Sequence, residues 1–139
     1  MRDVVHQELE PYGSEGGDGG RFVIEGPDFE LRPKMAVSLG MAFHELAANA
    51  AKHGALSKPT GQVRVTWELV RSSEPSALRL RWRETGGPPV ESTRRKGFGS
   101  IVIERGLALE LHAKVQIHLD PKGLICEIEI PLGGPAGRE

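Results

Sequence analysis

The chain has 139 residues with 18 basic and 19 acidic side chains, giving a formal net charge of −1 at pH 7. This length suits one domain with a real core and is too short for two, and the balanced charge gives no reason to expect a nucleic-acid or anionic-membrane partner. No apolar run reaches the ~20 residues of a membrane span and no basic-plus-apolar leader opens the chain, so we expect a cytoplasmic, reducing location without membrane contact by this domain.

The first third of the sequence is expected to hold two helices separated by two short strands. Residues 3–11 suit a short helix stopped by a proline, and a glycine-rich polar connector extends to residue 20. Residues 22–24 and 29–31 are predicted as short strands around a turn. A long helix then starts at Pro33, which fits a first helical turn, and ends at Gly54, which suits a C-terminal cap.

After the long helix, the apolar period changes from 3.6 to 2. Residues 63–69 and 78–82 alternate as two half-buried strands, which predicts a hairpin with its arginine rows on a solvated sheet face. Residues 100–112 are expected to form a second long helix, with Gly106 as its weak point. Residues 114–119 and 124–130 close the chain as a further hairpin.

This order of elements predicts one domain, 1–139, built as a two-layer α/β sandwich. Its sheet is expected to be mixed and mostly antiparallel, with the helices on one face. Cys126, the only cysteine, excludes an internal disulfide and is predicted to be a small buried side chain in the last strand. Residues 133–139 are rich in glycine and proline and are expected to be a frayed tail.

The long helix carries a polar stripe beside its apolar one. Glu45, Asn49 and Lys52 share one face at helical spacing. A carboxylate, an amide oxygen and a cation on consecutive turns suit a magnesium–phosphate group, because Mg²⁺ takes oxygen ligands and lysine compensates phosphate charge. An ordinary solvated helix flank is the alternative.

Glu84 is the most informative single residue. Strand alternation places it on the core side together with Trp82, and a buried carboxylate needs a partner. Gly86 and Gly87 then break the strand and allow the backbone to approach a flat ligand. The alternative is a strand that ends early, which would leave Glu84 in solvent beside an ordinary turn.

Three motifs in order resemble the ATP-binding catalytic domain of histidine kinases, and more narrowly its HWE subfamily. That subfamily is named for a histidine in the helix motif and a Trp-x-Glu in the first glycine motif. The resemblance covers nearly the whole chain and implies the Bergerat ATPase fold. The matching residues are His44, Glu45, Asn49, Lys52 and His53, then Trp82, Glu84, Gly86 and Gly87, then Gly97, Phe98 and Gly99.

The resemblance implies a site for Mg·ATP and a role for several residues. Asn49 would be the Mg²⁺ ligand, Glu45 the catalytic residue of the transfer step, and Lys52 a phosphate contact. Glu84 would accept a hydrogen bond from the adenine amine, where most of the wider superfamily uses aspartate. Residues 90–96 would be a short lid. The remaining nucleotide-binding positions would be His44, His53, Gly86, Gly87, Val90, Gly97, Phe98, Gly99 and Ser100.

Some of these assignments leave alternatives open. Gly97 and Gly99 stand directly before a helix, where free N–H groups favour anions, although a lone Gly-x-Gly there is common. His53 is also placed to cap the helix C-terminus. The helical wheel puts His44 outside both the apolar stripe and the centre of the polar one, and no role follows from that position.

No histidine of this chain has the context of a phosphoacceptor in the family. The implied partners are therefore a dimerisation and phosphoacceptor histidine domain of the same kinase, and a response regulator downstream. One alternative is an anti-sigma-type protein serine kinase, which the labelled residue of its partner would distinguish. Another is a nucleotide-dependent protein-binding module without transferase activity.

Overall fold

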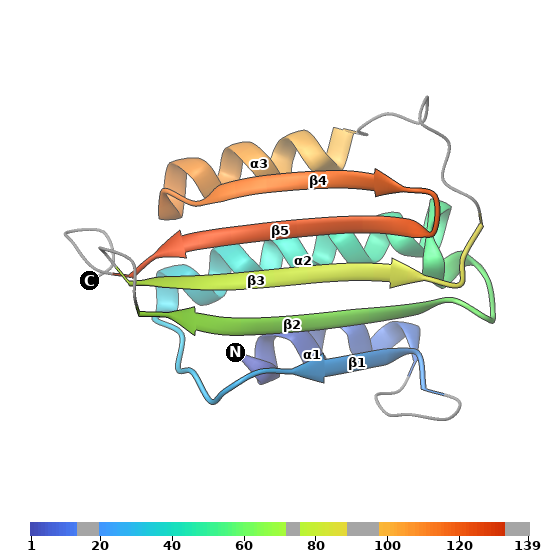
Figure 1. Cartoon of the computed structure of the whole chain (residues 1–139), viewed down its shortest axis with the longest axis horizontal. Helices are drawn as coiled ribbons and strands as arrows, with labels where there is room; N and C mark the ends of the chain where they lie inside the picture. Colours follow the sequence, from blue (N-terminus) through green and yellow to red (C-terminus); the bar gives the residue numbers. More distant parts are fainter. Residues whose placement is uncertain (14–19, 72–75, 89–97, 133–139) are drawn as a thin grey trace.

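The computed structural model describes residues 1–13, 20–71, 76–88 and 98–132. Within them lies a five-stranded sheet of order β1-β2-β3-β5-β4, in which β1 pairs with β2 in parallel and the other neighbours are antiparallel. All three helices cover the same face of the sheet (Figure 1), so the predicted two-layer sandwich is confirmed. The elements are α1 (Arg2–Leu9), β1 (Phe22–Glu25), α2 (Pro33–His53), β2 (Gln62–Val70), β3 (Ala77–Thr85), α3 (Phe98–Leu111), β4 (Lys114–Asp120) and β5 (Gly123–Pro131), with short 3-10 turns at Glu10–Tyr12 and Ala55–Ser57.

The core lies between the sheet and α2, where the two predicted periodicities meet. Leu39, Phe43 and Leu46 form the apolar stripe of α2, and each is at most 3% exposed. The alternating apolar residues of β2 and β3 face this stripe, and the ring of Phe43 stacks on Trp82 with centroids 6.4 Å apart. The helix is thus fixed to the middle of the sheet along its length.

One predicted strand is wrong. Residues 29–31 form no strand in the structure, although Phe29 and Leu31 pack against the core as the alternation requires. The preceding turn does not fold back on β1, because the Pro27 carbonyl accepts a 2.7 Å hydrogen bond from Trp67 Nε1. The chain then passes to the helix layer, where the Phe29 carbonyl accepts a hydrogen bond from the Met1 amino group.

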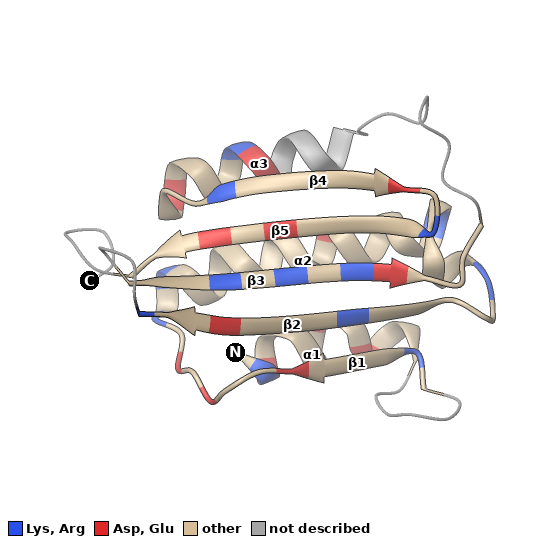
Figure 2. Ribbon diagram, in the orientation of Figure 1, with Lys and Arg blue, Asp and Glu red and all other residues tan. Residues whose placement is uncertain are grey.

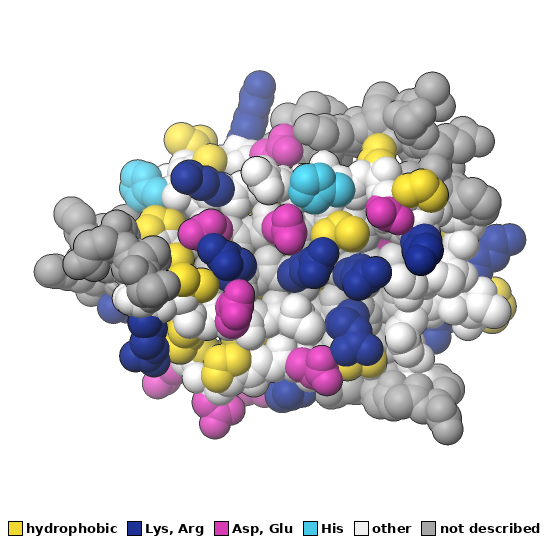
Figure 3. Space-filling view, in the orientation of Figure 1, with side chains coloured by type: hydrophobic (Ala, Val, Ile, Leu, Met, Phe, Trp, Pro, Cys, Tyr) yellow, Lys and Arg dark blue, Asp and Glu magenta, His cyan; other side chains and the backbone are white. Residues whose placement is uncertain are grey.

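The arginine rows lie on the open face of the sheet, as predicted. Figure 2 shows basic and acidic residues on β2, β3 and β5, and Figure 3 shows their side chains intermixed over this face. Arg64 pairs with Glu25 at 2.9 Å, and Arg79 lies 3.7 Å from Glu68 and 3.8 Å from Glu129. Exposed pairs of this kind contribute little to stability, and they make the face one of mixed charge.

Two simple expectations can be checked on the same structure. Cys126 is fully buried, and burial, assisted by the charge of Glu104, raises the pKa of its thiol to about 12. It is therefore an inert core residue, as predicted. Among the helices in the described part of the chain, none has the length and apolar character that a membrane crossing requires.

Candidate functional site

The elements that carry the described site residues meet toward one end of the molecule. The C-terminus of α2, the end of β3 and the first turn of α3 all lie on the right of Figure 1. The helix motif lies at the first of these places, the first glycine motif at the second, and Phe98 and Gly99 of the second glycine motif at the third. Segments far apart in sequence are therefore brought to a common edge of the sandwich.

Glu84 is a buried carboxylate at the centre of this edge. Only 4% of its surface is exposed, so the predicted inward orientation is confirmed and the solvent-exposed alternative is wrong. The backbone N–H of Ala55 donates to Glu84 Oε1 at 3.0 Å, and Trp82 Nε1 donates to Oε2 at 2.9 Å. Burial raises the pKa of Glu84, and the two hydrogen bonds oppose that rise.

Each carboxylate oxygen thus has one protein donor and retains acceptor capacity. An ionised carboxylate offers about four lone-pair sites, of which two are used here. The group is therefore already solvated by the protein in part, and it can still accept a hydrogen bond from a ligand. This is the chemistry expected of a recognition group for a neutral donor.

Two glycines permit the close approach of α2 and β3. A Cβ at Gly54 would stand 2.2 Å from Glu84 Oε1, so the space beside the carboxylate is available only to glycine. Gly86 has φ +77, and its carbonyl accepts a 2.7 Å hydrogen bond from Thr60 Oγ1. The strand break predicted at Gly86 and Gly87 is thus present, and it turns the chain toward the loop that follows α2.

Glu45, Asn49 and Lys52 occupy consecutive turns of the C-terminal half of α2, as predicted. Glu45 and Asn49 are half-buried, while Lys52 and His53 are exposed. A rise of about 1.5 Å per residue spreads the first three over roughly 10 Å. The polar face therefore leads along α2 to Gly54, and so to Glu84.

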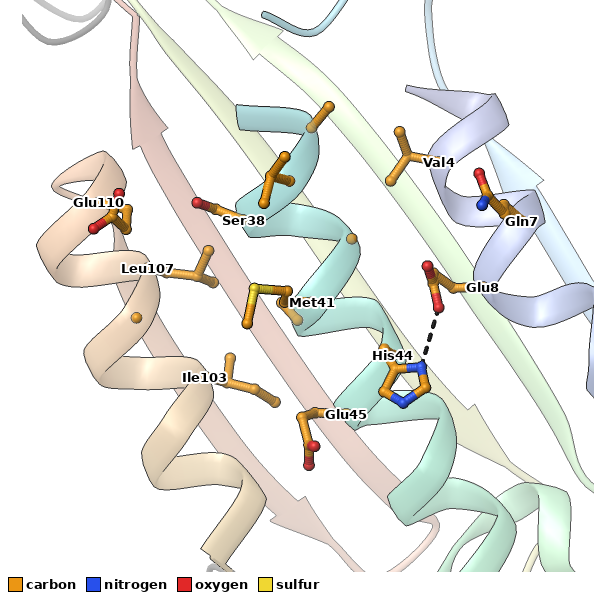
Figure 4. A pocket seen from close by; sticks show the side chains of 15 residues that line it. Val4, Gln7, Glu8, Ser38, Met41, His44, Glu45, Ile103, Leu107 and Glu110 are labelled. Carbon is orange, nitrogen blue, oxygen red and sulfur yellow. Dashed lines mark hydrogen bonds and ion pairs between the residues drawn. The ribbon is translucent and has the colours of Figure 1, made fainter. Parts of the chain in front are cut away.

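Glu45 also lines a groove in the helix layer that crosses α2, with residues of α1 on one side and of α3 on the other (Figure 4). Met41 of α2 and Leu107 of α3 form part of its apolar wall. Glu84 does not line this groove. The groove and the carboxylate are thus neighbouring but distinct features, connected through α2.

His44 turns to the other side of α2. Its Nδ1 lies 3.2 Å from Glu8 Oε1 on α1, and Figure 4 draws this contact. The ring is thus engaged with the N-terminal helix, whereas the neighbouring Glu45 points toward α3. The structure brings His44 near the N-terminal helix and does not show it beside Glu84.

The second glycine motif is only partly described. Val90, Gly97 and the predicted lid, 90–96, lie outside the described residues. The helix α3 starts at Phe98, two residues before the predicted start, so Phe98, Gly99 and Ser100 form its first turn. A helix N-terminus of this kind presents unpaired N–H groups to an anion.

Sequence reasoning missed the partner of Glu84. The donor is the backbone N–H of Ala55, and a backbone donor cannot be predicted from the residue type, since every residue except proline has one. Gly54 is the C-cap of α2, as predicted, and its N–H donates to the Ala50 carbonyl at 3.0 Å. Its φ of −115 lies outside the left-handed region, so the contact with Glu84 is what demands glycine here. No sequence signal pairs Gly54 with Glu84, because the two residues meet only where α2 ends against β3.

The described residues offer few ligands for a metal ion. Among the described residues no cluster of three His, Cys, Asp or Glu side chains can hold an ion. Asn49 and Glu45 offer two half-buried oxygen-bearing side chains one helical turn apart. Such a donor set fits a Mg²⁺ ion that keeps most of its ligands from phosphate oxygens and water.

The described residues thus form a mixed five-stranded sheet with their helices on one face. Solved structures share it. The histidine kinase domain of an Erythrobacter litoralis blue-light activated histidine kinase aligns over 94% of this chain and 58% of its own, with a TM-score of 0.64 and 18% identity. The catalytic domain of histidine kinase ThkA aligns over 94% of this chain and 92% of its own, with a TM-score of 0.63 and 14% identity. The Acinetobacter baumannii histidine kinase AdeS aligns over 96% of this chain and 65% of its own, with a TM-score of 0.69 and 15% identity.

Sequence similarity gives the same family. The chain is 36% identical over 132 residues to a blue-light-activated histidine kinase of Brucella anthropi, covering 95% of this chain and 26% of the relative. The Brucella ovis protein of the same name is 34% identical, and the match covers 95% of this chain and 27% of that relative. No protein-family model matches the chain. The chain thus belongs to the family of histidine-kinase catalytic domains, and it spans about a quarter of the length of the curated relatives it matches.

Proposed function

We propose that this domain binds Mg·ATP at the edge formed by α2, β3 and α3, and passes the γ-phosphoryl group to a histidine held on a separate segment. The observation that carries the proposal is Glu84. It is a buried acid oriented by two N–H donors, with acceptor capacity to spare, at the end of the polar face of α2. Such a group is expensive to bury unless a ligand or partner uses it.

The base is proposed to be adenine because of the direction of its hydrogen bond. The exocyclic amine of adenine donates, which suits a carboxylate acceptor. Guanine presents a carbonyl at the same position, and two acceptors facing each other repel. Glu84→Ala would leave the amine unpaired, at a cost of about 1–3 kcal/mol.

The phosphates are proposed to lie toward the polar face of α2 and the first turn of α3. Asn49 would supply an oxygen ligand to Mg²⁺, which when bound neutralises phosphate charge. Lys52 would contact a phosphate, and Glu45 would polarise or deprotonate the accepting histidine. Together with Trp82 and Glu84, His44 would place the domain in the HWE subfamily. Catalysis would rest on positioning and charge neutralisation.

The partners are proposed from the family. Two of the relatives are named as blue-light-activated histidine kinases, and this chain matches about a quarter of each, 26% and 27%. The remainder of such a protein would hold the dimerisation and phosphoacceptor histidine domain, and a response regulator would receive the phosphoryl group. We place the domain in the cytoplasm, where ATP is available.

The decisive experiment uses radiolabelled ATP with the domain alone and with its dimerisation hairpin added. We expect acid-labile label on the hairpin histidine only. Glu45→Ala should abolish transfer with little loss of nucleotide affinity, since a group that acts in the transition state affects rate more than ground-state binding. Glu110→Ala is the matched control, because Glu110 of α3 lines the same groove at the end opposite Glu45.

Two outcomes would contradict the proposal. Stoichiometric phosphohistidine on the isolated chain would place the acceptor within it. Phosphoserine on the added partner would favour an anti-sigma-type serine kinase instead.

A further inference from the structure

Trp82 makes a polar contact that its core position does not require. The side chain is fully buried and stacks on Phe43 with an interplanar angle of 22°. Its indole N–H donates to Glu84 Oε2 at 2.9 Å. Residues two apart on a strand project from the same face, so the spacing of Trp82 and Glu84 allows this bond without distorting β3.

The indole is held on several sides. In the sheet register Trp82 lies opposite Val65 of β2 and Cys126 of β5, and Phe43 covers it from α2. A ring packed in this way has no free rotation. The N–H therefore points at one place, and Glu84 Oε2 occupies it.

The carboxylate is consequently fixed by donors from two elements. Trp82 holds one oxygen from within β3, and the Ala55 N–H holds the other from the turn after α2. Hydrogen bonds to the charged form favour ionisation, while burial favours the neutral acid. The protonation state of Glu84 thus depends on burial, which raises its pKa, and on two hydrogen bonds that lower it, one of them from the indole N–H.

We propose that Trp82 is a positioning residue that sets base selectivity, because its N–H keeps Glu84 an oriented hydrogen-bond acceptor. This inference rests on the proposed recognition of adenine by Glu84. An ionised Glu84 accepts from the adenine amine and repels the guanine carbonyl. A protonated Glu84 can donate to that carbonyl instead. Loss of the indole N–H therefore weakens ATP binding and relaxes the exclusion of GTP.

The groups around the carboxylate leave few other causes of such an effect. From β5 the neighbouring titratable group is Cys126, whose thiol is neutral because its pKa is raised to about 12. From β2 the residue opposite Glu84 is Val63. From the end of α2 the contacts are the backbone of Gly54 and Ala55, and the adjoining Lys52 and His53 are exposed.

The test is calorimetry of ATP and GTP binding, with Mg²⁺, across a pH series between about 5 and 9. The proteins are wild type, Trp82→Phe, Glu84→Gln and the double variant. Trp82→Phe keeps an aromatic ring but removes the N–H. We expect it to lower ATP affinity about tenfold, to shrink the ATP:GTP ratio, and to raise the pH at which ATP affinity is half-maximal. In the Glu84→Gln background the pH shift should vanish.

Phe43→Leu is the control for packing, since it disturbs the same stack and leaves the N–H in place. It should lower stability without moving the ATP:GTP ratio or the pH midpoint. If Trp82→Phe fails to fold, site-specific replacement of Trp82 by benzothienylalanine keeps the ring shape and removes the donor. Site-specific incorporation is needed because Trp67 also uses its N–H.

Selectivity and pH midpoint unchanged in the variant lacking the donor would overturn the role of Trp82. Failure of the proposed function is separate. It would appear as a wild-type domain that does not bind ATP, or as a Glu84→Ala variant that binds ATP as well as wild type.

Discussion

His44 Nδ1 lies 3.2 Å from Glu8 Oε1, and this contact ties α2 to α1 across 36 residues of sequence. The next residue, Glu45, points to the opposite side of α2, toward α3 (Figure 4). Neighbouring helical positions differ by about 100°, so adjacent residues can serve different faces. The histidine that carries the subfamily resemblance therefore contacts the N-terminal helix, while the predicted catalytic acid lies on the α3 side of the same groove.

The first prediction concerns this contact. A double-mutant cycle of His44→Ala and Glu8→Ala should give a coupling of about 0.2–1 kcal/mol, because the His44 side chain is 67% exposed even though that of Glu8 is 25% exposed. Denaturant unfolding measures it, and His44→Asn, which keeps a donor near the Nδ1 position, should retain most of it. ATP affinity should change less than twofold. A tenfold loss in His44→Ala would instead support the nucleotide contact that the resemblance implies.

The second prediction concerns the metal. Asn49→Ala should weaken ATP binding when Mg²⁺ is present and have little effect when the metal is chelated. Thermal stability should be nearly unchanged, since Asn49 is half-buried beside the apolar stripe rather than in it. Calorimetry with and without EDTA separates the two cases. Equal affinities with Mg²⁺ present would sink the assignment.

The layers of the fold could be predicted from the sequence because its apolar periods are strong. The stripe through Leu39 and Phe43 defined α2, and alternation defined β2 and β3. The strand predicted at residues 29–31 is wrong because alternation indicates which side chains are buried and does not indicate the hydrogen-bond partner of the backbone. Phe29 is partly buried against the core, yet its carbonyl accepts from the Met1 amino group rather than from a strand.

The site could be predicted only as far as side-chain direction. The period of two placed Glu84 in the core, and that is where it lies. Its contacts depend on how α2 and β3 meet, which no local pattern specifies. Ala55 donates through its backbone, and neither the strand alternation nor the motif that contains Trp82 predicts that the indole N–H bonds to Glu84. The assignments of Val90 and Gly97 stay predictions, because both lie outside the described part of the chain.

The third prediction concerns pH and stability. The folded-state pKa of Glu84 is raised above its ordinary value by burial. Its stabilising contribution is therefore complete below the unfolded-state pKa, ~4.3, and is lost as pH rises through the folded-state value. Glu84→Gln has no charge to bury. Thermal melts across a pH series should show wild type losing stability relative to Glu84→Gln as pH rises, and a constant difference would contradict the shift.

The last prediction concerns Gly54. A Cβ there would lie 2.2 Å from Glu84 Oε1 and 3.1 Å from Ala50 Cα. The carboxylate cannot yield freely, because Oε1 is bound by the Ala55 N–H and Oε2 by Trp82. Gly54→Ala should therefore break at least one buried charged hydrogen bond, at about 1–3 kcal/mol, and lower ATP affinity as Glu84 moves.

Gly106→Ala is the matched control, because a Cβ at Gly106 would meet nothing within 4 Å. Gly106 lies inside α3, where alanine is favoured over glycine by roughly 0.5–1 kcal/mol, so this variant should be more stable than wild type. Denaturant unfolding gives both free energies. In a Glu84→Ala background, which removes the clashing oxygen, Gly54→Ala should lose most of its cost. A Gly54→Ala protein as stable as wild type would show that Glu84 can leave its two donors cheaply, and the carboxylate would then not be the fixed group on which the recognition of adenine depends.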